Sequence, residues 1–93
     1  MGPVLTQLEP KDTLRAKILV YLRDHGECSI GELARNLNYS MSNVRDRLLV
    51  AKRLGQVEEH TARVLNPSGG PVLSHFHKIT EEGKKWLVLV AEG

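Results

Sequence analysis

SIGELARNLNYSMSNVRDRLLVAKRLGQV, residues 29–57, is the stretch around which the sequence is organised. It predicts two short helices, over 29–38 and 40–54, with a tight turn between them. Ser29 with Glu32 three residues later is typical of a capping box, in which each side chain accepts from a free backbone N–H at a helix start. The first helix then places apolar residues on one face, which are Ile30, Leu33, Ala34 and Leu37.

The second helix begins after Asn38 and Tyr39, which interrupt the apolar pattern. Ser40 or Ser42 can cap it, and Gly55 suits its end, where a residue with positive φ is often needed. One side of this helix carries Val44, Arg47, Leu48 and Ala51. The other side carries Ser42, Arg45, Asp46, Leu49 and Arg53.

The rest of the chain predicts two more helices and a hairpin. A helix over 10–26 has an apolar stripe of Leu14, Ile18, Tyr21 and Leu22, with Lys11, Arg15, Lys17 and Arg23 expected in solvent. The hairpin over 56–79 has two strands joined by a loop rich in proline and glycine. Thr80 caps a last helix over 80–92. We therefore expect an α+β fold in one domain, residues 1–93.

Composition places the chain among globular proteins and excludes several classes. Hydrophobic residues make up 41% and charged residues 26%, with a net charge of +2. Any affinity for nucleic acid must therefore come from where the charges lie. We expect no signal peptide and no membrane span, because the longest apolar run, 86–91, is too short. A single cysteine, Cys28, excludes an internal disulfide and fits a reducing cytoplasm.

The stretch 29–57 resembles the helix-turn-helix of winged-helix DNA-binding proteins, especially the MarR (multiple-antibiotic-resistance) and ArsR (arsenic-repressor) types of bacterial and archaeal regulators. The residues that carry this resemblance are Leu37, Ser40, Ser42, Val44, Leu48, Gly55 and Val57. Residues 76–83 resemble the end of that family's wing and the start of its last helix. The resemblance implies a three-helix core, a hairpin wing and an extra C-terminal helix. It also implies a cytoplasmic transcription regulator, for example a repressor, of prokaryotic, viral or plasmid origin.

In such a fold the helix over 40–54 enters the major groove of double-stranded DNA, which admits one α-helix. The two serines at its start can donate to phosphate, beside free backbone N–H groups. Asn43 can reach adenine, and Arg45 can reach guanine or a phosphate. Asp46 either accepts from cytosine or holds an arginine in place. The residues expected to contact DNA on this helix are Ser40, Ser42, Asn43, Arg45, Asp46 and Arg53.

The wing carries Arg63, which best matches the basic wing residue of the family. In the family such a residue enters the minor groove or meets phosphate. Arg63 can equally be solvated, or pair with Glu58 or Glu59. The wing therefore predicts a second contact with DNA beside the helix.

Leu49 and Val50 depart from the family, whose members often carry basic or polar residues there. An apolar pair off the core stripe predicts contact with the wing, a second subunit or a thymine methyl group. With the small net charge, it also supports an alternative: a winged-helix module for protein–protein contact within a larger complex.

Metal binding and catalysis find little support in the sequence. The histidines His60, His75 and His77, with His25 and Cys28, invite a metal hypothesis, but no paired-cysteine or His/carboxylate helix motif accompanies them. Cys28 has no recognisable base, and Gly69 with Gly70 is too weak a signal for nucleotide binding. We therefore expect no metal, no cofactor and no enzymatic activity, and read Cys28 as a small buried apolar residue.

The last helix predicts a homodimer. Residues 86–90 are all apolar, and a small domain cannot bury every side of one terminal helix. A second copy of the same helix is the simplest cover, because two-fold pairing is the commonest oligomer symmetry. The residues predicted to dimerise are Trp86, Leu87, Leu89 and Val90. The alternative is that Val4, Leu5 and Leu8 fold back over this helix.

Overall fold

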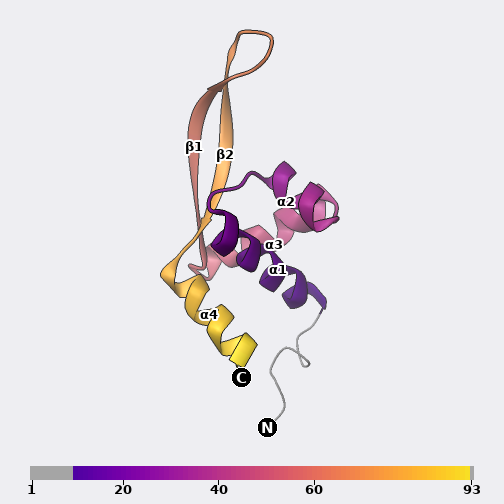
Figure 1. Ribbon diagram of the computed structural model, residues 1–93, viewed down its shortest axis with the longest axis vertical. Coiled ribbons are helices and arrows are strands. Elements are labelled where there is room, and N and C mark those ends of the chain that lie inside the picture. Colours follow the sequence, from indigo (N-terminus) through magenta and orange to yellow (C-terminus); the bar gives the residue numbers. More distant parts are fainter. Residues whose placement is uncertain (1–9, 93) are drawn as a thin grey trace.

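The computed structural model describes residues 10–92 and shows three packed helices, a long hairpin and a fourth helix (Figure 1). The elements in chain order are α1 (Pro10–His25), α2 (Ile30–Leu37), α3 (Met41–Arg53), β1 (Val57–Leu65), β2 (Pro71–Ile79) and α4 (Glu81–Glu92). The hairpin of β1 and β2 extends away from the helices (Figure 1). This arrangement confirms the predicted α+β winged helix-turn-helix. Each helix within the described residues is too short or too polar to span a bilayer.

Side-chain and glycine caps fix the ends of α2 and α3. Ser29 Oγ accepts from the backbone N–H of Glu32 at 3.2 Å, but the Glu32 carboxylate accepts instead from Tyr21 Oη at 3.3 Å. Only one half of the predicted capping box therefore forms, because a tertiary partner takes the other half. At the end of α3, Gly55 has φ 74°, and its N–H and that of Gln56 donate back to the last turn in a Schellman motif.

The core lies between the three packed helices and the base of the hairpin. Its fully buried members include Ile18, Leu19, Leu22, Leu33, Val44 and Leu48. Arg15, which was expected in solvent, is 8% exposed, and its guanidinium carbon lies 4.2 Å from the centroid of the Trp86 ring. The prediction for Arg15 was wrong because helix α4 covers that side of α1 and offers an aromatic face to the cation.

The wing is an antiparallel pair with Val57 opposite Ile79 and Arg63 opposite Leu73. Its base is joined to the helices by a bridge between Cys28 and His77, whose N–H groups donate to each other's carbonyl oxygens at 3.0 and 2.8 Å. The bridge adds a single strand residue, Cys28, beside β2. It fixes where the hairpin leaves the helical body.

Helix α4 is tied to the base of the wing and buries one side. Thr80 Oγ1 accepts from the N–H of Gly83 at 3.2 Å and donates to the carbonyl oxygen of Gly55. Of the four residues predicted to dimerise, Leu87 and Val90 are each 4% exposed in the chain's own core, and Trp86 is half-buried against it. Leu87 and Val90 therefore have little surface left for a second copy, because α4 turns both of them into the core. The outer side carries Leu89 and Val88, at 67% and 52% exposure.

Candidate nucleic-acid interface

The start of α3 leaves hydrogen-bond donors exposed. Ser40 is its N-cap, and its Oγ accepts from the backbone N–H of Asn43 at 3.1 Å. This bond uses a lone pair of the hydroxyl, so the Ser40 proton stays available to an acceptor from outside. Ser42 and Asn43 are exposed in the same turn. Free N–H groups, two hydroxyls and the positive end of the helix dipole together make a site suited to an anion.

The outer face of α3 is polar and uncommitted. Val44, Leu48 and Ala51 are buried, while the predicted outer residues Ser42, Arg45, Asp46, Leu49 and Arg53 are all exposed. Arg45, Asp46 and Arg53 form no ion pair among the residues whose side chains are described, 13–90. Asp46 therefore does not hold an arginine in place. These charged side chains face solvent and can form hydrogen bonds with a ligand.

A groove of about 420 Å³ separates α3 from the wing. Its helical wall carries Arg45, Leu49 and Lys52, and its strand wall carries Glu59, His75 and His77. Leu49, which departs from the family pattern, is 45% exposed and lines this groove beside Arg45. Contact with the wing was one of the predicted explanations for Leu49. Leu49 does lie next to the wing, across this groove.

Glu59 connects the wing to the end of α3. Its carboxylate forms an ion pair with Lys52. One of its oxygens also lies 2.7 Å from His75 Nδ1, at hydrogen-bond distance. The hydrogen bond from Lys52, followed by that from His75, lowers the pKa of Glu59 against the opposing effect of burial. Lys52 was not among the residues predicted to form the site, although it lies seven residues after Arg45 on the same helical face.

The remaining histidines, His25, His60 and His77, lie on different elements or on opposite faces of the wing. Burial lowers the pKa of His77, which is 3% exposed beside Glu59. His60 sits on the opposite face of the wing, with Nδ1 2.7 Å from Glu27 Oε2, and His25 stacks on Tyr21. No group of three or more metal-ligating side chains comes together within the described part of the chain.

Cys28 is buried, as the sequence suggested. It is 0% exposed, and burial, with the nearby Glu32 carboxylate, raises the pKa of its thiol to about 12. A thiol with so high a pKa stays protonated and unreactive at neutral pH.

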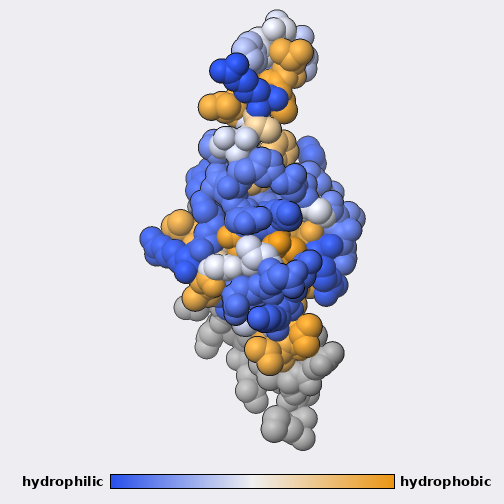
Figure 2. Space-filling model, turned by 90° about the vertical axis from the view of Figure 1, so that its left-hand side faces the viewer, coloured by the Kyte–Doolittle hydropathy of each residue, from blue (hydrophilic) through white to orange (hydrophobic). Residues whose placement is uncertain are grey.

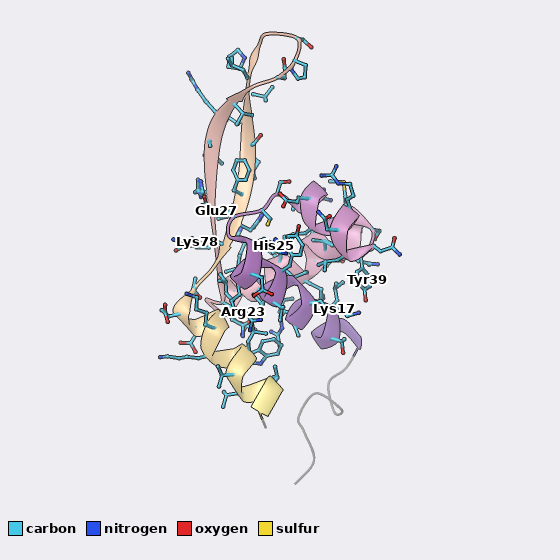
Figure 3. All side chains as sticks on the ribbon, in the orientation of Figure 1. Lys17, Arg23, His25, Glu27, Tyr39 and Lys78 are labelled. Atoms are coloured by element: carbon cyan, nitrogen blue, oxygen red, sulfur yellow. The ribbon has the colours of Figure 1, made fainter. Side chains whose placement is uncertain are left out.

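Lys17, a basic residue on α1, lies beside the turn of the helix-turn-helix. Lys17 Nζ on α1 donates to Tyr39 Oη at 3.1 Å and lies 5.4 Å from the centroid of that ring (Figure 3). Tyr39 directly precedes Ser40, the N-cap of α3. Lys17 is exposed, as predicted, but its pairing with Tyr39 could not be predicted because it depends on how α1 crosses the turn.

The far part of the wing is exposed on both faces. Arg63 is exposed and pairs with neither Glu58 nor Glu59, nor with any other acid among residues 13–90. Figure 2 shows hydrophobic side chains gathered at the end of the hairpin. These are Val64, Leu65, Val72 and Leu73, at 38%, 78%, 39% and 65% exposure.

Comparisons with known proteins agree with this geometry. The sequence profile described as "Bacterial regulatory protein, arsR family" matches residues 12–58, which run from α1 through α3 into β1. No curated protein sequence matches the chain.

Solved structures of larger proteins share the fold. A MarR family transcription regulator has a TM-score of 0.62 and 23% identity over 83% of this chain and 46% of its own. A MarR family protein from Bacillus stearothermophilus has a TM-score of 0.60 and 22% identity over 94% and 55%. BpsR from Bordetella bronchiseptica, whose DNA binding is regulated by 6-hydroxynicotinic acid, has a TM-score of 0.65 and 17% identity over 90% and 61%. The chain thus spans about half the length of these structures.

Proposed function

The chain belongs to the arsR family of bacterial regulatory proteins, and from this premise we propose that it binds double-stranded DNA as a sequence-specific transcription regulator. Helix α3 lies in the major groove, and the wing contacts the flanking DNA. The proposal includes no enzymatic activity, because the matching family is described as regulatory and burial keeps the Cys28 thiol protonated. BpsR, whose DNA binding is regulated, shares the fold with this chain.

The observation that supports this proposal best is the uncommitted outer face of α3. Asn43 and Arg45 have the donors and acceptors that recognise adenine and guanine edges, and both are exposed. Arg53 is exposed at the other end of the helix, and we assign it to a backbone phosphate. Ser40 and Ser42 contact phosphate at the helix start, and Asp46 accepts from cytosine.

We also propose that two copies pair through the outer side of α4. Val88 and Leu89 expose apolar surface there next to the half-buried Trp86. Pairing of two such helices would set two copies of α3 on a palindromic site, with half-sites about one DNA turn apart. The alternative cover by Val4, Leu5 and Leu8 concerns residues outside the described part of the chain. Sedimentation equilibrium should show a dimer that Leu89→Glu dissociates and that Arg35→Glu, at an exposed position on α2, leaves intact. A monomer at tens of micromolar would contradict the dimer.

One observation favours a second candidate, a module for protein–protein contact. Met41 and Leu49 on α3 are 50% and 45% exposed, and apolar residues on an otherwise polar helix suit a protein partner. The two candidates differ in their dependence on salt, because only DNA binding releases counterions from phosphate.

Gel-shift measurements with a random-sequence duplex pool at low and moderate salt test the proposal. We expect binding at low salt and a steep loss of affinity as salt rises, with a slope of about −0.9 for each phosphate contacted. Absence of binding to every duplex at low salt would exclude the regulator and favour the protein-contact module.

A further inference from the structure

The tip of the wing carries more apolar surface than a simple phosphate contact needs. Leu65 and Leu73 are 78% and 65% exposed, while the neighbouring Arg63 is the one charged residue between Thr61 and Ser74. Exposed leucines at the end of a hairpin cost solubility and suggest a surface that is covered when the protein works.

The two leucines lie on the face of the wing that continues the groove beside α3. Glu59 and His75 line that groove, and side chains two residues apart share a face of a strand. Arg63 and Leu65 on β1 therefore follow Glu59, and Leu73 on β2 follows His75. Arg63 is directly opposite Leu73 in the pairing of the strands. The groove and the tip therefore lie along the same face of the wing, which also carries the carboxylate of Glu59.

The tip is an ordered structure. The N–H of Asn66 donates to Gly70 O at 3.0 Å, and the N–H of Gly69 donates back to Asn66 O at 2.9 Å. The Asn66 side chain accepts from the N–H of Gly70 at 3.2 Å. Gly69 permits this turn with a φ of 94°. These hydrogen bonds close the backbone of the loop between the two strands that carry the leucines.

We infer that Leu65 and Leu73 act as an apolar wedge in the minor groove of DNA, beside Arg63, and bend the duplex. The inference rests on the proposed DNA binding and adds a mode of recognition to it. Minor-groove proteins insert leucine side chains between base steps and kink DNA by about 20–90°. The step that opens most easily is pyrimidine–purine, so the wedge selects flexible TA or CA steps in the flank.

Charge and size favour DNA over a second copy as the occupant of this surface. Residues 60–80 contain no Asp or Glu, so nothing on the wing beyond Glu59 repels phosphate. A stable protein interface uses about 20–30 residues on each side, far more than the tip offers. A narrow hairpin end with two leucines and one arginine suits a groove that is only about 6 Å wide.

The test uses a duplex selected by the wild-type chain from a random pool, labelled with end dyes for bending and with 2-aminopurine in the flank for unstacking. We expect wild-type protein to shorten the end-to-end distance and to raise 2-aminopurine fluorescence. Leu65→Ser with Leu73→Ser should abolish both signals and weaken binding about tenfold. Val64→Ser with Val72→Ser, on the opposite face of the same hairpin, should leave all three unchanged.

The outcomes separate this inference from the proposed function. Binding by the wild type without bending, or equal effects of the two double variants, would overturn the wedge and leave DNA binding intact. Failure of the wild type to bind any duplex would overturn both. A dimer that becomes monomeric only in Leu65→Ser with Leu73→Ser would show that the tip joins two copies and overturn the wedge. Thermal unfolding of both double variants controls for loss of the fold.

Discussion

The base and the tip of the wing are made by the same two strands but have opposite surroundings. At the base, Val57 and Ile79 are buried, Glu59 is bound to Lys52 and His75, and Cys28 bridges to His77. At the tip, the side chains of Leu65 and Leu73 have no cover. The base therefore holds the hairpin at a set position beside α3, whereas the tip is free to contact a partner.

This difference separates residues that stabilise the fold from residues that are available to bind a partner. A side chain at the base has its hydrogen bonds and apolar contacts within the chain, so its replacement changes stability first. A side chain at the tip has few such contacts, so its replacement changes binding first. The same substitution made at both places can therefore test the distinction.

Replacing Gly83 at the base or Gly70 near the tip by alanine should give the largest difference in stability between the two regions. A Cβ at Gly83 would lie 2.4 Å from the backbone oxygen of Gln56, so α4 must shift from the base of the wing. We expect Gly83→Ala to lower the free energy of unfolding by about 2–3 kcal/mol, as overpacking does. At Gly70, near the tip, nothing lies within 4 Å of the added Cβ, and the change should stay within about 0.5 kcal/mol. Urea unfolding measures both, and equal losses would mean that the tip is packed as tightly as the base.

The sequence predicts the elements well because their ends depend on local chemistry. Ser29 and Ser40 cap their helices and Gly26 and Gly55 end theirs with positive φ, all through bonds within a few residues. The cap of α4 by Thr80 follows the same rule.

Contacts between elements could not be predicted in the same way. The pairing of Lys52 with Glu59 depends on the angle at which the wing leaves α3. The burial of Leu87 depends on the rotation of α4, which a run of five apolar residues leaves open. Arg15 shows the same limit, because its cover comes from Trp86, far along the chain.

Arg45 lies where the base of the wing meets α3, and its guanidinium has no partner among the described acids. If it reads a guanine, Arg45→Ala should weaken specific binding by about 1–3 kcal/mol and relax the preference at one base pair. Titration of a selected duplex and of its single-base variants measures both effects. The matched control is Arg23→Ala, an exposed arginine on α1 that pairs with Asp24. An equal loss in the control would show that Arg45 supplies only general charge.

The stability that the base of the wing contributes should also depend on pH, whereas the tip has no group that titrates near neutral pH. Burial lowers the pKa of His77 below the ordinary histidine value of 6.5, next to Glu59, Lys52 and His75. The unfolded chain then binds a proton that the folded chain does not, so stability falls as the pH drops below about 6.5, by at most about 1.4 kcal/mol per pH unit. Glu59 adds a separate loss of stability below the ordinary glutamate pKa of 4.5, because its own pKa in the folded chain is lowered. Urea unfolding between pH 7 and 5 should show the first loss in the wild type and not in His77→Gln. A slope that persists in that variant would assign it to another group.

Arg63 should give the smallest and most uniform effect, because it stands on the exposed part of the wing without an acidic partner. A phosphate or minor-groove contact there adds charge without reading a base, so Arg63→Ala should weaken binding to all duplexes alike. The slope of log affinity against log salt should decrease in magnitude by about one, because one phosphate contact is lost. Arg63→Lys keeps the charge and should restore the slope, whereas a loss confined to one sequence in Arg63→Ala would mean that the tip reads bases. Binding that is unchanged in Arg63→Ala at every salt concentration would place the tip outside the DNA contact, and the wing would then serve another partner.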